Sequence, residues 1–181
     1  RKKKGSAMKT LPIVLSPDPG LRQVCEPCEV GDPALKKLAK QMLETMYANT
    51  GCGLAAPQIG LNKRLVVIDC SDPDDEPAPL YLVNPEIVEV SEEEQTGIEG
   101  CLSLPGKWGL VSRPEYAKVR AQDRHGDWYE YEGEDLTARC FLHEIDHLDG
   151  HMYTEFAEKM LTPEELAALE QQEADNEEDE G

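Results

Sequence analysis

The pattern of apolar positions predicts a helix that begins near residue 33. Asp32 can cap its first turn, and Pro33 is well tolerated at the first helical position. Apolar side chains then recur at helical spacing on one face, at Leu35, Leu38, Met42 and Met46. Polar and glycine-rich residues at 49–53 end the pattern, so the apolar face of this helix is predicted to pack on a core.

Short apolar runs separated by turn residues predict strands in the middle of the chain. Residues 64–69 form a nearly continuous apolar run, which favours a buried strand, and residues 71–79, rich in Asp and Pro, read as a loop. Further short strands are expected at residues 81–83, 87–90, 117–121 and 128–131. His125 stands between the last two, in a sequence typical of a hairpin turn.

Two more helices are predicted in the last third of the chain. Residues 135–149 carry an apolar stripe, with Asp135 as the expected cap and Gly150 as the stop. Thr162-Pro-Glu-Glu165 is a capping box that opens a last helix, which is expected to end near Gln171. Helices mixed with short, mainly antiparallel strands make the predicted fold class α+β, with an N-terminal helix, a central helix and a C-terminal helix.

The length of 181 residues allows one sizeable core. We expect a tag remnant or disordered basic tail at 1–7, one folded domain at 8–170, and a disordered acidic tail at 171–181. No apolar run is long enough for a membrane span, so no membrane partner is expected.

Charge and cysteine content limit the partners and the compartment. The net charge is −19, and it stays strongly negative even without the acidic tail and the basic start, so the surface should repel phosphate backbones and no DNA partner is expected. Six cysteines lack the dense framework of a small secreted protein, which favours a reducing, cytoplasmic location. Cys25 and Cys28 form a lone C-x-x-C without a second pair.

The central helix contains the sequence His143-Glu144-Ile-Asp-His147, the H-E-x-x-H pattern. Two histidines four residues apart lie on the same helix face and can bind one cation, while Glu144 lies about 100° round the helix and can face a water on the metal. The alternative is that both histidines are ordinary core or surface residues. A third ligand is needed, and the cysteine of Glu99-Gly-Cys101-Leu-Ser-Leu-Pro105 is the candidate upstream.

Three separated motifs together resemble peptide deformylase. They are Gly51-Cys-Gly53-Leu-Ala-Ala-Pro57-Gln58, Glu99-Gly-Cys101-Leu-Ser-Leu-Pro105 and His143-Glu144-Ile-Asp-His147-Leu, in the family's order and spacing. The resemblance spans roughly residues 11–156. It implies sheets around a central metal-bearing H-E-x-x-H helix, and a hydrolase that removes the N-formyl group from the first methionine of nascent peptides and releases formate.

The resemblance also implies the roles of the site residues. Cys101, His143 and His147 would hold one divalent metal, Fe²⁺ as the native ion with Zn²⁺ or Ni²⁺ as alternatives. Glu144 would accept a proton from a water on that metal. The side-chain amide of Gln58 and the backbone N–H of Leu102 would stabilise the oxyanion. Because Ala56 precedes a proline, an extended approach to Gln58 is expected.

Residues beside the ligands are candidates for binding the substrate. An apolar pocket for the methionine side chain is predicted from Ile98, Leu136 and Cys140, each of which could instead pack in the core. Gly53, with Gly51, is expected to let the backbone approach the substrate. Glu99 is placed near the substrate and also, with Arg113 and Asp146, among the groups that could orient the ligands.

Two departures from the family pattern and two other functions stay open. Leu142 stands before His143 where many members have glutamine. The acidic C-terminus cannot dock on RNA, so a transient ribosome contact would use another surface.

The other functions are a zinc-dependent peptidase and a non-catalytic, metal-stabilised binding module. Release of formate without cleavage of the peptide bond would separate deformylase from both.

Overall fold

The computed structural model describes residues 9–180, so the expectation for residues 1–7 lies outside the described residues. The α-helices are α1 (Pro33–Ala48), α2 (Asp135–Leu148) and α3 (Pro163–Glu180). The strands are β1 (Gly53–Ala55), β2 (Leu65–Ile68), β3 (Leu80–Val90), β4 (Glu94–Cys101), β5 (Leu104–Pro114), β6 (Tyr116–Gln122), β7 (Trp128–Glu134) and β8 (Lys159–Met160). Three short 3₁₀ helices are η1 (Pro19–Arg22), η2 (Ala56–Ile59) and η3 (Tyr153–Glu155).

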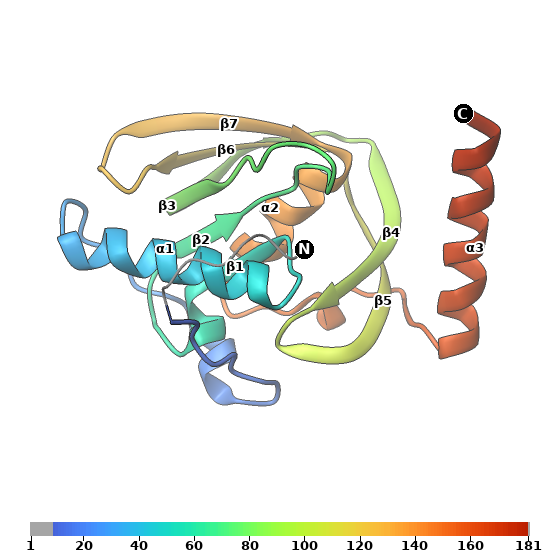
Figure 1. Ribbon diagram of the computed structural model, residues 1–181, viewed down its shortest axis with the longest axis horizontal. Coiled ribbons are helices and arrows are strands. Elements are labelled where there is room, and N and C mark those ends of the chain that lie inside the picture. Colours follow the sequence, from blue (N-terminus) through green and yellow to red (C-terminus); the bar gives the residue numbers. More distant parts are fainter. Residues whose placement is uncertain (1–8, 181) are drawn as a thin grey trace.

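The strands form two antiparallel sheets around α2 (Figure 1). The larger sheet has the order β1-β2-β3-β6-β7, and the smaller has the order β4-β5-β8. This arrangement confirms the predicted α+β class. His125 lies in the turn that joins β6 to β7, as the sequence predicts.

The larger sheet is covered by a helix on each face. Val66 and Ile68 of β2 belong to the apolar cluster that contains the α2 side chains, whereas Leu65 and Val67 belong to the cluster that contains α1. Because successive side chains of a strand point to opposite faces, the continuous apolar run of β2 is buried on both sides. α2 is thereby fixed in the centre of the molecule.

The predicted α1 is confirmed with its cap. The Asp32 side chain accepts a hydrogen bond from the Ala34 N–H at 2.9 Å, and Pro33 occupies the first turn. For α2 the cap differs from the prediction, because Glu134 is the N-cap residue and makes no side-chain cap hydrogen bond, while Asp135 has a positive φ of 50°. The Asp135 N–H instead bonds the Glu115 carbonyl, so the sheet positions the start of this helix.

The strand predictions are incomplete. Residues 80–90 form one strand, β3, rather than two, because Asn84 takes a left-handed conformation that shifts the register without ending the pairing. The strands β4 and β5 were not predicted. Most of their residues are exposed or half-buried, so the alternation that marks a strand on a core is weak in this stretch.

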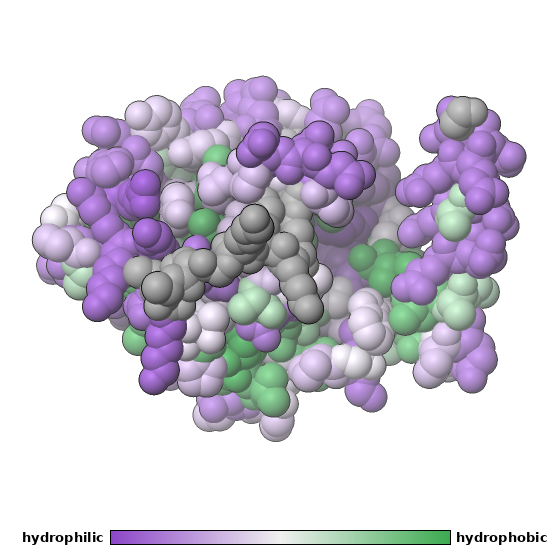
Figure 2. All heavy atoms as spheres, in the orientation of Figure 1, coloured by the Kyte–Doolittle hydropathy of each residue, from purple (hydrophilic) through white to green (hydrophobic). Residues whose placement is uncertain are grey.

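The C-terminal helix α3 starts at the predicted capping box and runs further than predicted. Thr162 and Glu165 exchange backbone-to-side-chain hydrogen bonds at 3.1 and 3.2 Å. The helix continues past Gln171 to Glu180, because Glu, Gln and Ala are strong helix formers. None of its residues is buried, and it stands apart from the sheets in Figure 1. In Figure 2 its upper part is mostly hydrophilic, whereas apolar atoms gather near its lower end.

Candidate metal centre and active site

The H-E-x-x-H sequence lies in the last turns of α2, inside the protein. His143, Glu144 and His147 are all buried, with 8%, 5% and 1% of their surface exposed. Leu142, which precedes them, packs in the same apolar cluster as Phe141. The helical spacing therefore aims both imidazoles at one interior point while the apolar side of α2 faces the large sheet.

Cys101 completes a set of three donors. It is the last residue of β4, and the small sheet brings it to the histidine face of α2. The ligand atoms of Cys101, His143 and His147 lie within 4.8 Å of one another, and the Cys101 sulfur is 3.3 Å from His147 Nε2. One thiolate and two imidazoles suit Zn²⁺ or Fe²⁺, so the donor set fits a divalent metal.

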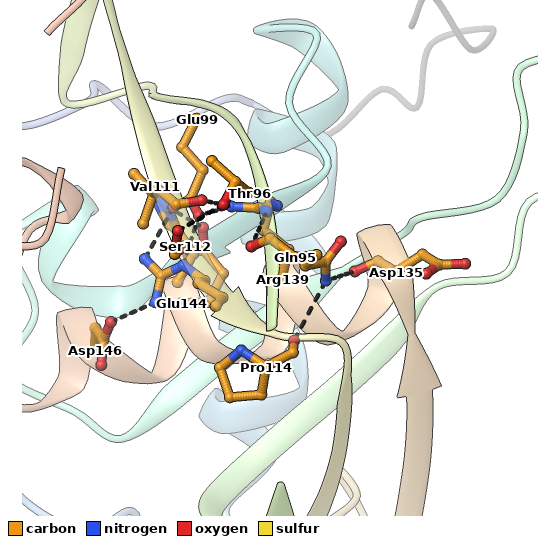
Figure 3. Close-up of polar contacts among 12 residues, drawn as sticks. Gln95, Thr96, Glu99, Val111, Ser112, Pro114, Asp135, Arg139, Glu144 and Asp146 are labelled. Atoms are coloured by element: carbon orange, nitrogen blue, oxygen red, sulfur yellow. Dashed lines mark hydrogen bonds and ion pairs between the residues drawn. The ribbon is translucent and has the colours of Figure 1, made fainter. Parts of the chain in front are cut away.

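Glu99 fixes the orientation of His143. Its Oε1 lies 2.7 Å from His143 Nδ1, which leaves Nε2 free to face a metal. The same carboxylate accepts hydrogen bonds from Arg113 at 2.5 and 2.9 Å and from Arg139 at 2.6 Å (Figure 3). Burial alone would raise the pKa of Glu99, but the hydrogen bonds from His143 and Arg113 outweigh it and lower the pKa to about 2.

The ion-pair network extends to the outside of the helix. Arg113 also donates to Asp146 at 2.9 Å, so the three predicted orienting groups are in one network. Arg139 donates to the Val111 carbonyl at 2.9 Å, and its guanidinium lies against Gly97, where a Cβ would be 2.9 Å from Nη2. These contacts join β4, β5 and α2 behind the metal donors.

Gln58 lies beside Cys101, held by both ends of its amide. Its Oε1 accepts the Ala55 N–H at 2.9 Å, and its Nε2 donates to Ser103 at 3.2 Å and to the Cys101 sulfur at 3.3 Å. The expected extended backbone at Ala56 is wrong, because Ala56 opens the 3₁₀ helix η2 and Ala55 is the extended residue. Proline in the first turn supports this helix start, since its fixed φ suits the turn.

Glycine 53 makes room for Glu144. A Cβ at Gly53 would lie 2.7 Å from Glu144 Cγ and 2.9 Å from Oε1, and one at Gly51 would lie 2.9 Å from Leu102 Cδ1. The glycines therefore accommodate these two side chains, and both also line the cavity beside the donors. Burial raises the pKa of Glu144 to about 7, and its buried Oε2 has no hydrogen-bond partner within the described residues.

A cavity of about 500 Å³ opens beside the donors. Its walls include all five predicted substrate-binding residues: Gly53, Ile98, Glu99, Leu136 and Cys140. Leu136 is 54% exposed, so a role in the core does not explain it. Ile98 is half-buried, whereas Cys140 is buried and belongs to the cluster under the large sheet as well.

Arg139 and Tyr153 were not predicted as site residues. Arg139 stands four residues before His143, so the same helical spacing that pairs the histidines could have indicated it. The ring of Tyr153 stacks on His143 with centroids 5.8 Å apart, and no sequence signal marks it. His151, which lies outside the metal donor set, contacts exposed Glu155 at 2.8 Å.

A half-buried cysteine and two buried imidazoles lie beside a buried carboxylate at one side of a cavity, an arrangement that suits a metal-dependent hydrolase. The model of the family described as Polypeptide deformylase matches residues 10–162. The chain therefore belongs to the peptide deformylase family, hydrolases that act on formylmethionyl peptides.

The similarity of this chain to known relatives and to solved structures extends over most of its length. The peptide deformylase of Agathobacter rectalis is 51% identical over 80% of this chain and 87% of its own length, and that of Bartonella henselae is 45% identical over 84% and 87%. The crystal structure of the Thermotoga maritima peptide deformylase is 37% identical with a TM-score of 0.78, covering 83% of this chain and 99% of that one. That of the Ehrlichia chaffeensis enzyme in complex with actinonin is 38% identical with a TM-score of 0.79, covering 84% and 91%.

Across the described residues, no helix combines the length and the apolar character that a bilayer crossing requires.

Substituting Glu99 with glutamine is expected to weaken both the fold and the metal centre. The change leaves two buried guanidinium groups without their shared carboxylate, so the free energy of unfolding should fall by about 3 kcal/mol. Metal affinity should fall about 10–100-fold because His143 loses its orienting partner. Denaturant unfolding and competition with a chromophoric chelator measure the two effects. Glu94→Gln, an exposed change on the same strand, should alter neither; equal effects of both variants would contradict the assigned role.

Proposed function

We propose that this chain hydrolyses the formyl group of N-formylmethionyl nascent peptides at the site formed by Cys101, His143, His147 and Glu144. The observation that carries the proposal is the convergence of three donor atoms within 4.8 Å on a buried acid and a cavity of about 500 Å³. Membership in the peptide deformylase family supplies the reaction and the substrate class.

Cys101, His143 and His147 would hold the metal. A divalent ion bound there would act as a Lewis acid and would make water a better nucleophile near neutral pH. Glu99 keeps His143 in the required tautomer, because its carboxylate accepts a hydrogen bond from Nδ1–H and leaves the lone pair of Nε2 for the metal. The Arg113 and Arg139 guanidinium groups neutralise Glu99 in the buried site.

Glu144 acts as the proton carrier. With its pKa raised to about 7 by burial, the carboxylate can take a proton from the attacking water and pass it to the leaving amine. Its Oε2, which lacks a partner within the described residues, is the atom free to do so. Gly53 holds the side chain in position by offering no Cβ.

Gln58 and the backbone N–H of Leu102 stabilise the negative charge on the formyl oxygen. The Ala55 N–H holds Gln58 Oε1, so the amide NH₂ is directed toward Cys101 and the site. A preorganised donor of this kind contributes about 3 kcal/mol to stabilisation of the transition state. Ser103, which receives the other Nε2 hydrogen bond, holds the amide in this position.

The methionine side chain of the substrate binds in the cavity, against Ile98, Leu136 and Cys140. All three line the cavity next to His143 and Glu144. Sulfur and methylene groups suit this apolar wall. Leu136 lies on the first turn of α2 and is exposed, so its side chain is accessible to a substrate in the cavity.

We infer Fe²⁺ as the native metal, with Zn²⁺ or Ni²⁺ able to replace it. A single thiolate with two imidazoles accommodates each of these ions. Purification without oxygen, followed by metal analysis and by activity after reconstitution with each ion, tests this assignment. Equal metal occupancy with the highest turnover for Zn²⁺ would contradict it.

Formate release from paired substrates tests the proposed function. A formylmethionyl peptide should yield formate and an intact methionyl peptide, and the unformylated peptide of the same sequence should stay unchanged. Cleavage of an internal bond in both peptides would instead identify a zinc-dependent peptidase. Metal binding without change in either peptide would identify a non-catalytic, metal-stabilised module.

A Gly53→Ala variant is expected to lose most of its activity while staying folded. The φ angle of Gly53 lies outside the left-handed region, so alanine fits the backbone, but the new Cβ would lie 2.7 Å from Glu144. Displacing the acid by about 1 Å should lower kcat about 10²-fold. Steady-state kinetics and the melting temperature measure the change. A variant with full kcat would mean that the position of Glu144 does not depend on Gly53.

The catalytic domain is assigned to residues 8–170, with 171–181 as a dispensable acidic tail. Truncation after Gln171 should leave kcat/KM for a small formylmethionyl peptide unchanged within about twofold, a barrier change near 0.4 kcal/mol. The reason is that no residue of α3 is buried. A tenfold fall with intact fold and metal content would show that the tail reaches the active site.

The charge of the chain and its cysteines indicate which nucleic-acid partners and which cellular compartment to expect. The acidic α3 repels RNA, so a transient contact with the ribosome would use another surface, and binding to DNA is not expected. Six free cysteines, one of which is the proposed thiolate ligand Cys101, suit the reducing cytoplasm.

A further inference from the structure

Three cysteines outside the proposed catalytic donor set gather at one point of the fold. Cys52 precedes β1, Cys70 follows β2 after one residue, and Cys140 lies on α2. Their sulfur atoms lie within 4.8 Å of one another, and those of Cys52 and Cys140 are 3.2 Å apart. The cluster shares no residue with Cys101, His143 and His147.

The large sheet and α2 hold the three thiols together. β1 and β2 pair antiparallel with Gly53 opposite Ile68, and the Asp69 N–H donates to the Cys52 carbonyl at 2.9 Å. The ends of these two strands are therefore tied beside each other. Cys140 belongs to the apolar cluster of α2, and Cys70 packs against that cluster. Three separate elements fix the sulfur positions, so the site is largely preformed.

We propose that Cys52, Cys70 and Cys140 form a second metal site, which takes a soft, thiophilic cation such as Zn²⁺. Thiolates are the ligands that such cations prefer. Zinc–sulfur bonds of about 2.3 Å place the sulfurs of a tetrahedral site about 3.8 Å apart. The three sulfur atoms already lie within 4.8 Å of one another. To bind the ion, the 3.2 Å distance between the Cys52 and Cys140 sulfurs needs only a small increase.

The surroundings favour entry and binding of a cation. Cys52 is exposed, whereas Cys140 is buried, so the site has one open side for entry and for a fourth ligand such as water. Hydrogen bonds from Cys140 and Cys70 lower the pKa of Cys52, whereas the pKa values of Cys70 and Cys140 are raised, in part by their hydrogen bonds with Cys52. Binding then releases the remaining thiol protons.

The second site lies next to the catalytic cavity. Cys52 and Cys140 line that cavity, whereas Cys70 is not among its lining residues. Cys140 is one helical turn before His143, and Cys52 adjoins the glycine that contacts Glu144. A cation in the cluster would therefore fix the cavity wall without sharing a ligand with the catalytic centre.

Zinc titration of the full-length protein, stripped of metal and kept in a reducing buffer, tests the proposal. Competition with a chromophoric chelator should reveal two tightly bound equivalents in the parent chain and one in Cys70→Ser. The matched control is the double variant Cys25→Ser/Cys28→Ser, which should keep two. One equivalent in the parent chain, or two in Cys70→Ser, would overturn the proposal, as would loss of the second equivalent in the double variant.

Two readouts on the parent chain make the test independent of how the variants fold. A second equivalent of Co²⁺ should add a near-ultraviolet sulfur-to-metal charge-transfer band stronger than that of the first, because three thiolates bind it in place of one. Zinc should also protect Cys52 from alkylation, as followed by peptide mass spectrometry, while labelling of the half-buried Cys28 stays unchanged. A second equivalent without added charge-transfer intensity, or with Cys52 still fully reactive, would rule out the cluster as its ligand set.

Discussion

Replacing Glu144 with glutamine is expected to lower kcat for a formylmethionyl peptide by about 10²–10⁴-fold, the usual contribution of a positioned general base. The amide keeps the shape of the side chain in the space left by Gly53, but it cannot accept the water proton. The metal content should stay that of the parent chain, because Glu144 does not belong to the donor set. Steady-state kinetics combined with elemental analysis measure both quantities.

The control for this variant is Glu134→Gln. Glu134 is exposed, immediately precedes the same helix and makes no side-chain cap hydrogen bond, so its substitution should change neither kcat nor metal content. If Glu144→Gln lost the metal together with activity, Glu144 would be a structural or ligating residue and the proposed proton transfer would fail. If it kept full turnover, another group would have to carry the proton.

The parts of the fold that the sequence predicts are those with a local physical signal. α1 has its Asp32 cap and a stripe of apolar residues, and α2 has two histidines at helical spacing, so both could be recognised without tertiary information. The exposed strands β4 and β5 lack such a signal, because they are held by pairing with each other and by contacts with η3. Because β4 was not predicted, the sequence also did not indicate how Cys101, its last residue, comes to lie beside α2.

Contacts between distant segments explain what was missed in the site. Arg139 gains its role only when β4 brings Glu99 beside it, 40 residues away in sequence. The sequence indicates that Gly53 lets the backbone approach the substrate, but it gives no sign that the missing Cβ also makes room for Glu144, 91 positions later. The cluster of Cys52, Cys70 and Cys140 carries no recognisable spacing at all, since it depends on the pairing of β1 with β2 under α2.

The second large effect is expected for Cys101→Ser, which should remove the metal from the catalytic centre and with it the activity. A neutral hydroxyl is a poor ligand compared with a thiolate, and the two imidazoles alone leave the set incomplete. Metal affinity should fall by more than the factor of about 10–100 expected when a hydrogen-bond partner of a ligand is removed. The variant should contain one metal equivalent fewer than the parent chain.

A matched control separates the loss of a ligand from the general effect of a serine in place of a cysteine. The Cys28 thiol donates to the Arg64 carbonyl at 3.6 Å, a hydrogen bond that a hydroxyl can also make, and it belongs to neither cysteine-containing donor set. Cys28→Ser should therefore keep its metal and its kcat. Because Gln58 Nε2 lies 3.3 Å from the Cys101 sulfur, the serine variant could still hold the amide in place, so its inactivity would report on the metal alone. A Cys101→Ser protein with the parent metal content and turnover would exclude Cys101 as a ligand and would leave His143 and His147 in need of a different third donor.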